Sequence, residues 1–121
     1  WIERTETMNY EHELSVGRQA AVAAAKLCEA VRLSLVPQAM TKTDRTPVTI
    51  ADYGSQAVIC KILGEAFPND PVVAEEDADD LRSADRKIQL GQVTDFVQRT
   101  LGNSSLVRPE EVLRWIDRGN C

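Results

Sequence analysis

The sequence predicts an α+β fold that is rich in helix, because its 121 residues contain four amphipathic stretches and one short apolar run. Apolar residues recur at spacings of three and four in the ranges 9–36, 49–67, 87–101 and 109–118, which is typical of helices that bury one face. The run Val72–Ala74 has no polar alternation, which is typical of a short buried strand. We therefore expect helices packed on a small sheet.

The first predicted helix, residues 9–36, has a stripe of apolar and small side chains that we expect to pack on a neighbouring helix. Pro37 ends this range, because proline breaks the helical hydrogen-bond pattern. The single histidine, His12, falls in the first turns, where we expect it on the surface. The predicted stripe consists of Leu14, Gly17, Ala21, Ala24, Cys28, Val31 and Leu35.

The second predicted helix follows a polar loop, residues 38–46, and a short extended piece at Pro47 and Val48. Thr49 and Asp52 stand three residues apart, as in a capping box, so we expect Thr49 at the N-cap and Asp52 in the first turn. The expected inward stripe of this helix consists of Ile59, Ile62, Leu63, Ala66 and Phe67.

Two further helices follow an acidic, polar connection at residues 77–86. The range 87–101 should bury Leu90, Val93, Val97 and Leu101, with Gly102 just beyond its end. Pro109 is expected at the first position of the last helix, where its missing N–H costs nothing. The acidic pair that follows Pro109 lies near the positive end of the helix dipole.

Composition excludes two classes of partner. Fourteen basic residues against nineteen acidic ones give a net charge of −5, and no basic cluster suits a nucleic-acid backbone. No run of about 18 apolar residues exists, so no membrane span is expected. The opening residues lack a secretory apolar core. We expect residues 1–8 to be a leader or a remnant added for expression, and residues 9–121 to form one α+β domain.

The three cysteines, Cys28, Cys60 and Cys121, are odd in number and have no metal-ligand spacing. Cys28 and Cys60 lie within apolar helical patterns, so we expect both to be buried free thiols. Free thiols suit a reducing compartment, which favours a cytoplasmic protein.

Carboxylates follow the predicted strand closely, at Glu75, Glu76, Asp77, Asp79 and Asp80. The strand end should place Glu75 near the helix start that carries Asp52. Two converging carboxylates suit a hard cation such as Mg²⁺, which takes one or two protein carboxylates together with water and phosphate oxygens. The alternative from spacing alone is a helix-start aspartate beside a solvated acidic loop.

Three stretches of the sequence resemble a known family of enzymes. KTDRTPVTIADYGSQ (42–56), FPNDPVVAEED (67–77) and VLRWIDRGN (112–120) are similar to the front part of the lithium-sensitive, magnesium-dependent phosphatases. This is the inositol monophosphatase and fructose-1,6-bisphosphatase superfamily, and the 3'(2'),5'-bisphosphate nucleotidase branch is the nearest in pattern. The resemblance covers about residues 9 to 120.

The resemblance implies the helix-rich N-terminal half of the inositol monophosphatase-like sugar phosphatase fold, with Mg²⁺ as cofactor. Glu75 matches the position that binds Mg²⁺ directly, and Asp52 matches the carboxylate that orients or deprotonates the attacking water. Glu76 and Lys42 match secondary positions. The implied substrate is a nucleotide bisphosphate, adenosine 3',5'-bisphosphate in the first instance, which links the enzyme to sulfur metabolism.

One family motif is absent: the sequence contains no D-P-[IL]-D-G-T, which carries further metal ligands in the family. We therefore expect the chain to be the N-terminal part of a longer enzyme and to be catalytically silent by itself. Two alternatives stay open, an inositol monophosphatase-type phosphatase and a non-catalytic helical interaction module. Neither the substrate-binding residues nor the oligomeric state can be assigned from the sequence.

Overall fold

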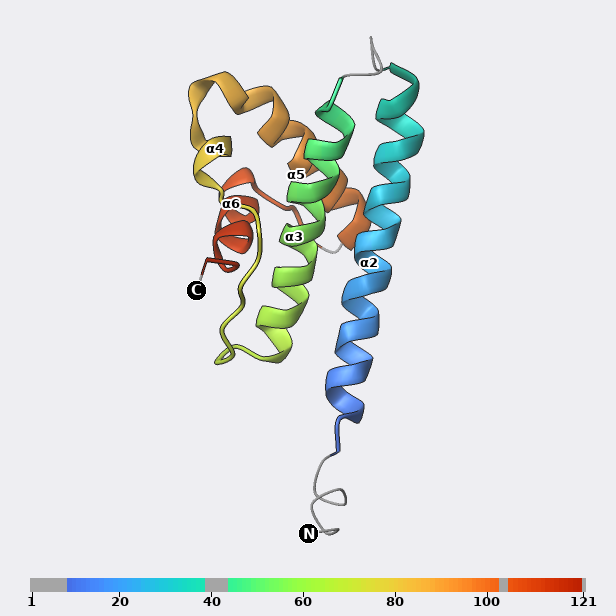
Figure 1. Cartoon of the computed structure of the whole chain (residues 1–121), viewed down its shortest axis with the longest axis vertical. Helices are drawn as coiled ribbons and strands as arrows, with labels where there is room; N and C mark the ends of the chain where they lie inside the picture. Colours follow the sequence, from blue (N-terminus) through green and yellow to red (C-terminus); the bar gives the residue numbers. More distant parts are fainter. Residues whose placement is uncertain (1–8, 39–43, 103–104, 121) are drawn as a thin grey trace.

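The computed structural model of the chain describes residues 9–38, 44–102 and 105–120 (Figure 1). Every element in this part of the chain is helical. Four α-helices make up most of it, and one short α-helix and two 3₁₀ turns connect them. In chain order the elements are α2 (Glu11–Leu35), η1 (Val36–Gln38), α3 (Thr46–Ala66), α4 (Asp79–Arg82), η2 (Ala84–Arg86), α5 (Lys87–Leu101) and α6 (Pro109–Asp117).

The predicted α+β class is wrong for the described residues, because they contain no strand and no sheet. The expected strand, Val72–Ala74, makes only an isolated antiparallel bridge between Val73 and Asn120. Nor is this run buried, since the Val73 side chain is 85% exposed. The physical reason is that the partner of this run is the loop after α6 rather than another strand: the Ala74 N–H donates to the Gly119 carbonyl at 2.8 Å.

Helix α3 is the centre of the molecule, because α2, α5 and α6 all pack on it. Figure 1 shows α2 and α3 side by side, α6 on the other side of α3, and α5 crossing behind. The chain between α3 and α4 runs back along α3 as an extended loop. All four long helices contribute fully buried side chains to the core, and Ala78 and Leu81 join them from the chain around α4. The helical ones are Leu27, Val31, Ile50, Ala57, Val58, Val93, Val97, Val112 and Ile116.

The predicted range of α2 is right to within two residues at its start and one at its end, but the predicted inward face is wrong in most positions. Leu14 is 55% exposed, and the residues that are buried are Val16, Ala20, Leu27 and Val31. A close contact with α3 selects this face. The side chain of Leu27 lies over Gly54, where an added Cβ would come within 2.9 Å of both Leu27 methyl groups.

Because α2 buries a different face from the predicted one, one cysteine prediction is also wrong. Cys28 is exposed, and its Sγ lies 3.2 Å from the hydroxyl of Ser55. Cys60 is a buried free thiol as expected, and burial raises its pKa. Cys121 lies outside the described residues.

Helix α3 begins at Thr46, so the expected capping box at Thr49 and the extended piece at Pro47 are both wrong. Pro47 instead occupies the first turn, where its missing N–H has no helical partner to lose. The N–H of Thr49 donates to the carbonyl of Arg45 at 2.9 Å, as an interior helical residue does. Asp52 therefore lies in the second turn of α3. The predicted inward stripe is only partly buried, and Ile50, Tyr53, Ala57 and Val58 form the buried face.

The last two predicted helices are confirmed. Helix α5 spans the predicted range, and Gly102 beyond it has a φ of 89°, a conformation that favours glycine. Helix α6 begins at Pro109, and the Glu111 carboxylate accepts the Arg108 N–H at 3.0 Å. No helix within the described ranges is both long and apolar enough to cross a membrane.

Candidate functional site: an acidic segment held against α3

The acidic segment, residues 75–80, is held through the carboxamide of one glutamine. Gln56 Oε1 accepts the backbone N–H of Glu76 at 2.9 Å, and Gln56 Nε2 donates to the carbonyl of the same residue at 2.8 Å. Nε2 also donates to the carbonyl of Ile116 in α6, at 2.8 Å. The side chain of Gln56 is 8% exposed, so one buried amide joins α3, α6 and the acidic segment.

Alternate N–H groups along this stretch donate to fixed acceptors, which is the period of an extended chain. The Ala74 N–H donates to the Gly119 carbonyl at 2.8 Å, and the Ala78 N–H donates to Asp117 Oδ1 at 3.3 Å. The Glu76 N–H lies between them. The side chains in between, at positions 75 and 77, are exposed. The stretch thus has strand-like backbone pairing, and side chains and one loop carbonyl act as its partners.

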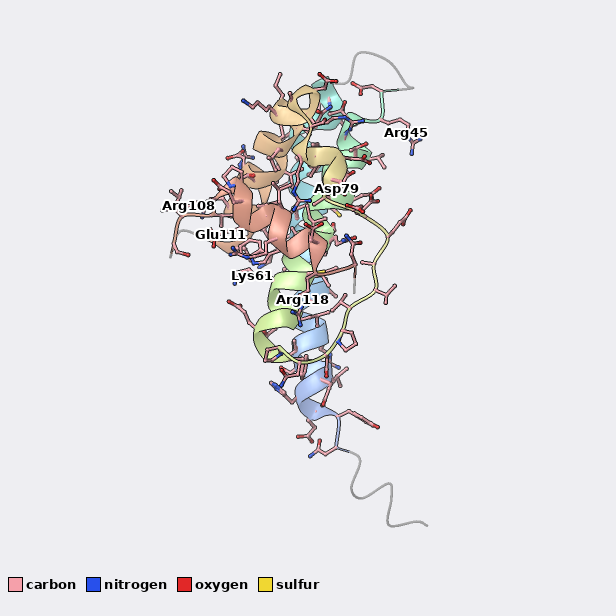
Figure 2. All side chains as sticks on the ribbon, turned by 90° about the vertical axis from the view of Figure 1, so that its left-hand side faces the viewer. Arg45, Lys61, Asp79, Arg108, Glu111 and Arg118 are labelled. Carbon is pink, nitrogen blue, oxygen red and sulfur yellow. The ribbon has the colours of Figure 1, made fainter. Side chains whose placement is uncertain are left out.

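Arg118 and Arg82 fix the chain before and after the acidic segment. The Arg118 guanidinium donates to the carbonyls of Phe67 and Asp70, at 3.1 Å each, and so fixes the turn that follows α3. Arg82 pairs with Asp117 and, at 2.7 Å, with Asp79. Arg118 and Asp79 mark the two ends of this stretch in Figure 2.

Asp52 lies one helical turn before Gln56, so the two side chains share one face of α3. That face is the one against which the acidic segment lies. The pKa of Glu76 is raised above its ordinary value, first by burial and then by the negative charges of Asp52, Glu75 and Asp80. The structure therefore places Asp52 close enough for its negative charge to raise the pKa of Glu76, although the two residues are 24 positions apart in sequence.

The pKa of Tyr53, on the same helix, is also raised by burial and by carboxylates of the acidic segment. Its ring is 5% exposed. Burial raises the pKa of its hydroxyl, and the carboxylates of Asp80 and Glu76 raise it further. Negative charge is thus concentrated at this face of α3. The positive charge of Arg86 acts in the opposite direction and lowers the pKa of the Tyr53 hydroxyl.

The candidate residues have distinct positions. Asp52 is exposed on α3 and Glu75 is exposed on the acidic segment, whereas Glu76 is partly buried between them. Lys42 lies outside the described residues. Their predicted roles stay predictions. Sequence reasoning missed Gln56 and Asp117, because a polar side chain within an amphipathic helix gives no sign of which distant backbone group it will bind.

The carboxylates of this face are the kind of ligand that a hard divalent cation takes, but they are too few to complete its coordination shell. Carboxylate oxygens are the ligands that Mg²⁺ takes, and the crowding that raises the Glu76 pKa is what a bound cation would relieve. No group of three or more His, Cys, Asp or Glu side chains within the described ranges is arranged to hold a metal ion. The residues present could therefore supply one or two ligands, and water or other groups would supply the rest.

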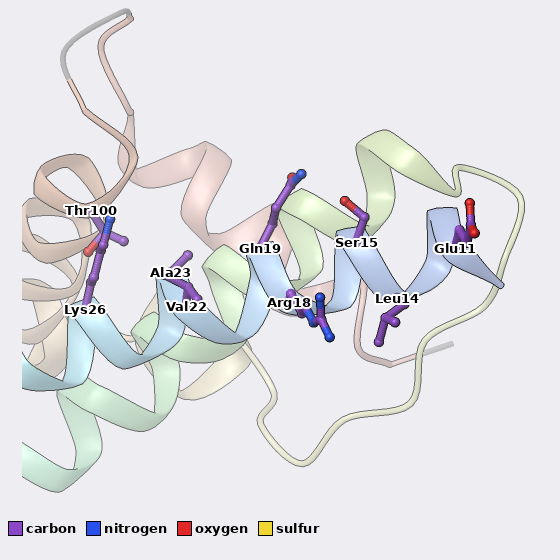
Figure 3. Close-up of a pocket in the computed structure, with 9 residues that line it drawn as sticks. All are labelled: Glu11, Leu14, Ser15, Arg18, Gln19, Val22, Ala23, Lys26 and Thr100. Carbon is purple, nitrogen blue, oxygen red and sulfur yellow. The ribbon is translucent and has the colours of Figure 1, made fainter.

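Two surface hollows lie away from the acidic segment. One, of about 620 Å³, follows the exposed side of α2 and is lined by Leu14, Val22 and Lys26 among others, with Thr100 from α5 (Figure 3). Another, of about 570 Å³, lies between α3 and α6 beside Trp115 and Arg118. Neither of these two hollows is lined by Asp52 or the acidic segment.

No protein-family model matches the chain. Individual relatives do match. The chain is 40% identical over 120 residues to 3'(2'),5'-bisphosphate nucleotidase 1 of Arabidopsis thaliana, covering 93% of this chain and 34% of that protein. It is 34% identical over 125 residues to 3'(2'),5'-bisphosphate nucleotidase of Schizosaccharomyces pombe, with 93% and 35% covered. It is 36% identical over 126 residues to 3'(2'),5'-bisphosphate nucleotidase 2 of Candida albicans, with 94% and 35% covered.

These relatives bear the names of phosphatases that act on nucleotide bisphosphates. The resemblance expected from the three motif stretches is confirmed: the chain is related in sequence to the 3'(2'),5'-bisphosphate nucleotidases over nearly its whole length. The chain spans about a third of the length of the curated relatives it matches.

Proposed function

We propose that this chain is the part of a Mg²⁺-dependent 3'(2'),5'-bisphosphate nucleotidase that supplies the first metal-binding carboxylate and the base. The reaction is hydrolysis of a phosphomonoester, removing the 3'-phosphate of adenosine 3',5'-bisphosphate to leave AMP. The observation that carries the proposal is the similarity over 93% of the chain, which includes both Asp52 and the acidic segment. The placement of that segment on the Asp52 face of α3 supports it.

In this proposal Glu75 holds Mg²⁺, with Glu76 beside it as a supporting carboxylate. A bound Mg²⁺ polarises a phosphoryl oxygen and lowers the pKa of a water molecule. Asp52 orients that water and accepts its proton, as a general base does. The water oxygen forms a new bond to phosphorus, and the bond from phosphorus to the ester oxygen of the ribose breaks. That oxygen takes up a proton from solvent and leaves as the 3'-hydroxyl. Lys42 is a secondary candidate near the same site.

The proposal also accounts for the net charge of the protein. A chain with a net charge of −5 repels an anionic substrate, and a cation held by the acidic segment would draw the phosphate group in. Because the described residues supply one or two carboxylates to such a site, we propose that Mg²⁺ binds weakly to this chain alone and that the chain alone is inactive. A cytoplasmic location is part of the proposal, and the free thiols at Cys28 and Cys60 suit it. The role in sulfur metabolism follows from the proposed substrate.

The test is phosphate release by the full-length protein that carries this chain. Glu75→Gln and Asp52→Asn should each lower kcat for adenosine 3',5'-bisphosphate, by about 10²–10⁴-fold for the loss of the base. Excess Mg²⁺ should partly rescue Glu75→Gln, because its defect is metal occupancy, and should not rescue Asp52→Asn to the same degree. Asp95→Asn, an exposed aspartate of α5 paired with Arg99, is the matched control and should keep full activity.

Full activity of Glu75→Gln or Asp52→Asn at ordinary Mg²⁺ would contradict the proposal. Faster hydrolysis of inositol monophosphate than of the nucleotide would favour the other branch of the superfamily. Equal rescue of both variants by Mg²⁺ would leave the metal site standing and remove the separate base role of Asp52.

A further inference from the structure

The Gln56 amide uses both of its donor hydrogens and its acceptor oxygen. Both Nε2 hydrogens are donated, to the carbonyls of Glu76 and Ile116, and Oε1 accepts the Glu76 N–H. Exchanging the oxygen and nitrogen of this amide would turn a carbonyl oxygen toward two other carbonyls. The orientation is therefore fixed by its partners, and the side chain cannot turn without losing all three bonds.

The Gln56 amide is closely surrounded by other parts of the chain. Gly119 passes directly against it, and an added Cβ there would lie 2.7 Å from Gln56 Nε2 and 2.7 Å from the Cβ of Ala74. The Gly119 residue is itself buried. The amide is thus enclosed between α6, the loop after α6 and the start of the acidic segment.

We infer that Gln56 is a positioning residue for the candidate metal site, because its carboxamide sets where the Glu75–Glu76 backbone lies relative to Asp52. The inference rests on the proposed function. Gln56 lies on the same helix face as Asp52 and one turn away, and it binds the backbone of Glu76, the residue next to Glu75. One rigid helix therefore carries both the proposed base and the group that holds the proposed metal-binding segment.

Gln98 is a matched control within the same chain. Its Nε2 donates to the carbonyls of Gly102 and Ser105, at 2.6 and 3.1 Å, and its Oε1 accepts the Val107 N–H at 2.5 Å. This amide binds a loop in the same way as Gln56 does, but its loop carries no candidate site residue. Gln56→Met and Gln98→Met remove the same hydrogen-bonding groups and keep similar side-chain lengths.

The experiment is an NMR titration of the 121-residue chain with Mg²⁺, with amide hydrogen exchange measured on the same samples. Gln56→Met should lose exchange protection at Glu76 and bind Mg²⁺ about tenfold more weakly at Glu75 and Asp52, as is usual for groups that orient metal ligands. Gln98→Met should lose protection at Val107 and keep its Mg²⁺ affinity within about twofold. Gln56→Asn, which keeps a buried amide but is one methylene shorter, should show an intermediate loss of affinity and serves if Gln56→Met does not fold.

The outcomes separate the inference from the proposed function. A folded Gln56 variant that loses Glu76 protection and still binds Mg²⁺ as tightly as the unaltered chain would overturn the positioning role alone. An equal loss of affinity in Gln98→Met would also overturn it, because the effect would then be general destabilisation. An unaltered chain in which excess Mg²⁺ causes no change at Glu75 or Asp52 would overturn the metal site of the proposed function, and the positioning role with it.

Discussion

Two loops of this molecule are fastened by the same device, a glutamine amide on a neighbouring helix, and they differ in what the device joins. Gln98 binds the connection between α5 and α6, four to nine residues further along the chain. Gln56 binds Glu76 and Ile116, which lie 20 and 60 residues away. The first is a local cap for the end of a helix, and the second connects three parts of the fold.

The difference shows how the fold holds a segment whose like charges repel one another. The loop held by Gln98 contributes Val107, a buried apolar side chain, to the core. The segment held by Gln56 carries five carboxylates and contributes Ala78, between Asp77 and Asp79, to the core, and the buried Leu81 follows it directly. The acidic segment thus has apolar attachments at its far end and a buried amide at its near end, and these oppose the repulsion among its charges.

The largest expected difference between the two loops is in stability. Gln56→Met leaves a buried N–H and two carbonyls without a partner, at about 1–3 kcal/mol for each group that stays unsatisfied, so we expect a loss of about 3 kcal/mol in the free energy of unfolding. Gln98→Met should cost about 1–2 kcal/mol, because the exposed Ser105 carbonyl can bind water instead. Urea denaturation of both variants measures this, and an equal or reversed order would contradict the comparison.

The next effect concerns two glycines. Gly119→Ala places a Cβ 2.7 Å from Ala74 and from the Gln56 amide, so it should destabilise the chain by about 1–3 kcal/mol. Gly91→Ala in α5 meets nothing within 4 Å and should stabilise it by about 0.5–1 kcal/mol, because alanine favours helix. Thermal unfolding of the pair checks both signs. A neutral Gly119→Ala would show that the amide is not enclosed as tightly as the structure has it.

The smallest expected effect is the pH dependence of Glu76. Its pKa is raised in the folded state, so the folded chain binds this proton more tightly than the unfolded chain. Stability is therefore lost as the pH rises from the ordinary value near 4.5 through the raised pKa, and the loss is complete above it. Glu76→Gln keeps both backbone bonds to Gln56 and should gain a few tenths of a kcal/mol at pH 7 in the absence of Mg²⁺. Denaturation at pH 4 and pH 7 tests this, and a destabilised Glu76→Gln at pH 7 would contradict it.

The sequence was a good guide to those parts of the fold that local chemistry decides. Pro109 and Gly102 mark helix ends through their own backbone preferences, so α5 and α6 were predicted correctly. The face of α2 was not, because an alanine-rich helix offers several stripes of equal quality, and only the contact of Leu27 with Gly54 selects one. Distant partners decided that choice, which no local pattern records.

The strand prediction failed for a related reason. Val72–Ala74 has the composition of a strand, but the backbone hydrogen bonds with the period of an extended chain begin at its last residue, Ala74, and continue at Glu76 and Ala78. The partners are the Gly119 carbonyl and side chains 20 or more residues away, at Gln56 and Asp117. For the candidate site, the sequence pointed to Asp52, Glu75 and Glu76 through the family resemblance, whereas Gln56, which joins them, was missed.

The most direct test of the account is where a divalent cation binds on this chain. Mn²⁺ is a paramagnetic substitute for Mg²⁺ that also takes oxygen ligands. Titrated at low concentration, it should broaden the NMR signals of Asp52, Glu75 and Glu76 together, leave those around Val107 sharp, and lose this effect when Mg²⁺ is added in excess. Broadening at Glu75 without Asp52, or equal broadening at exposed carboxylates such as Glu29 and Asp95, would contradict the claim that α3 and the acidic segment form one cation site.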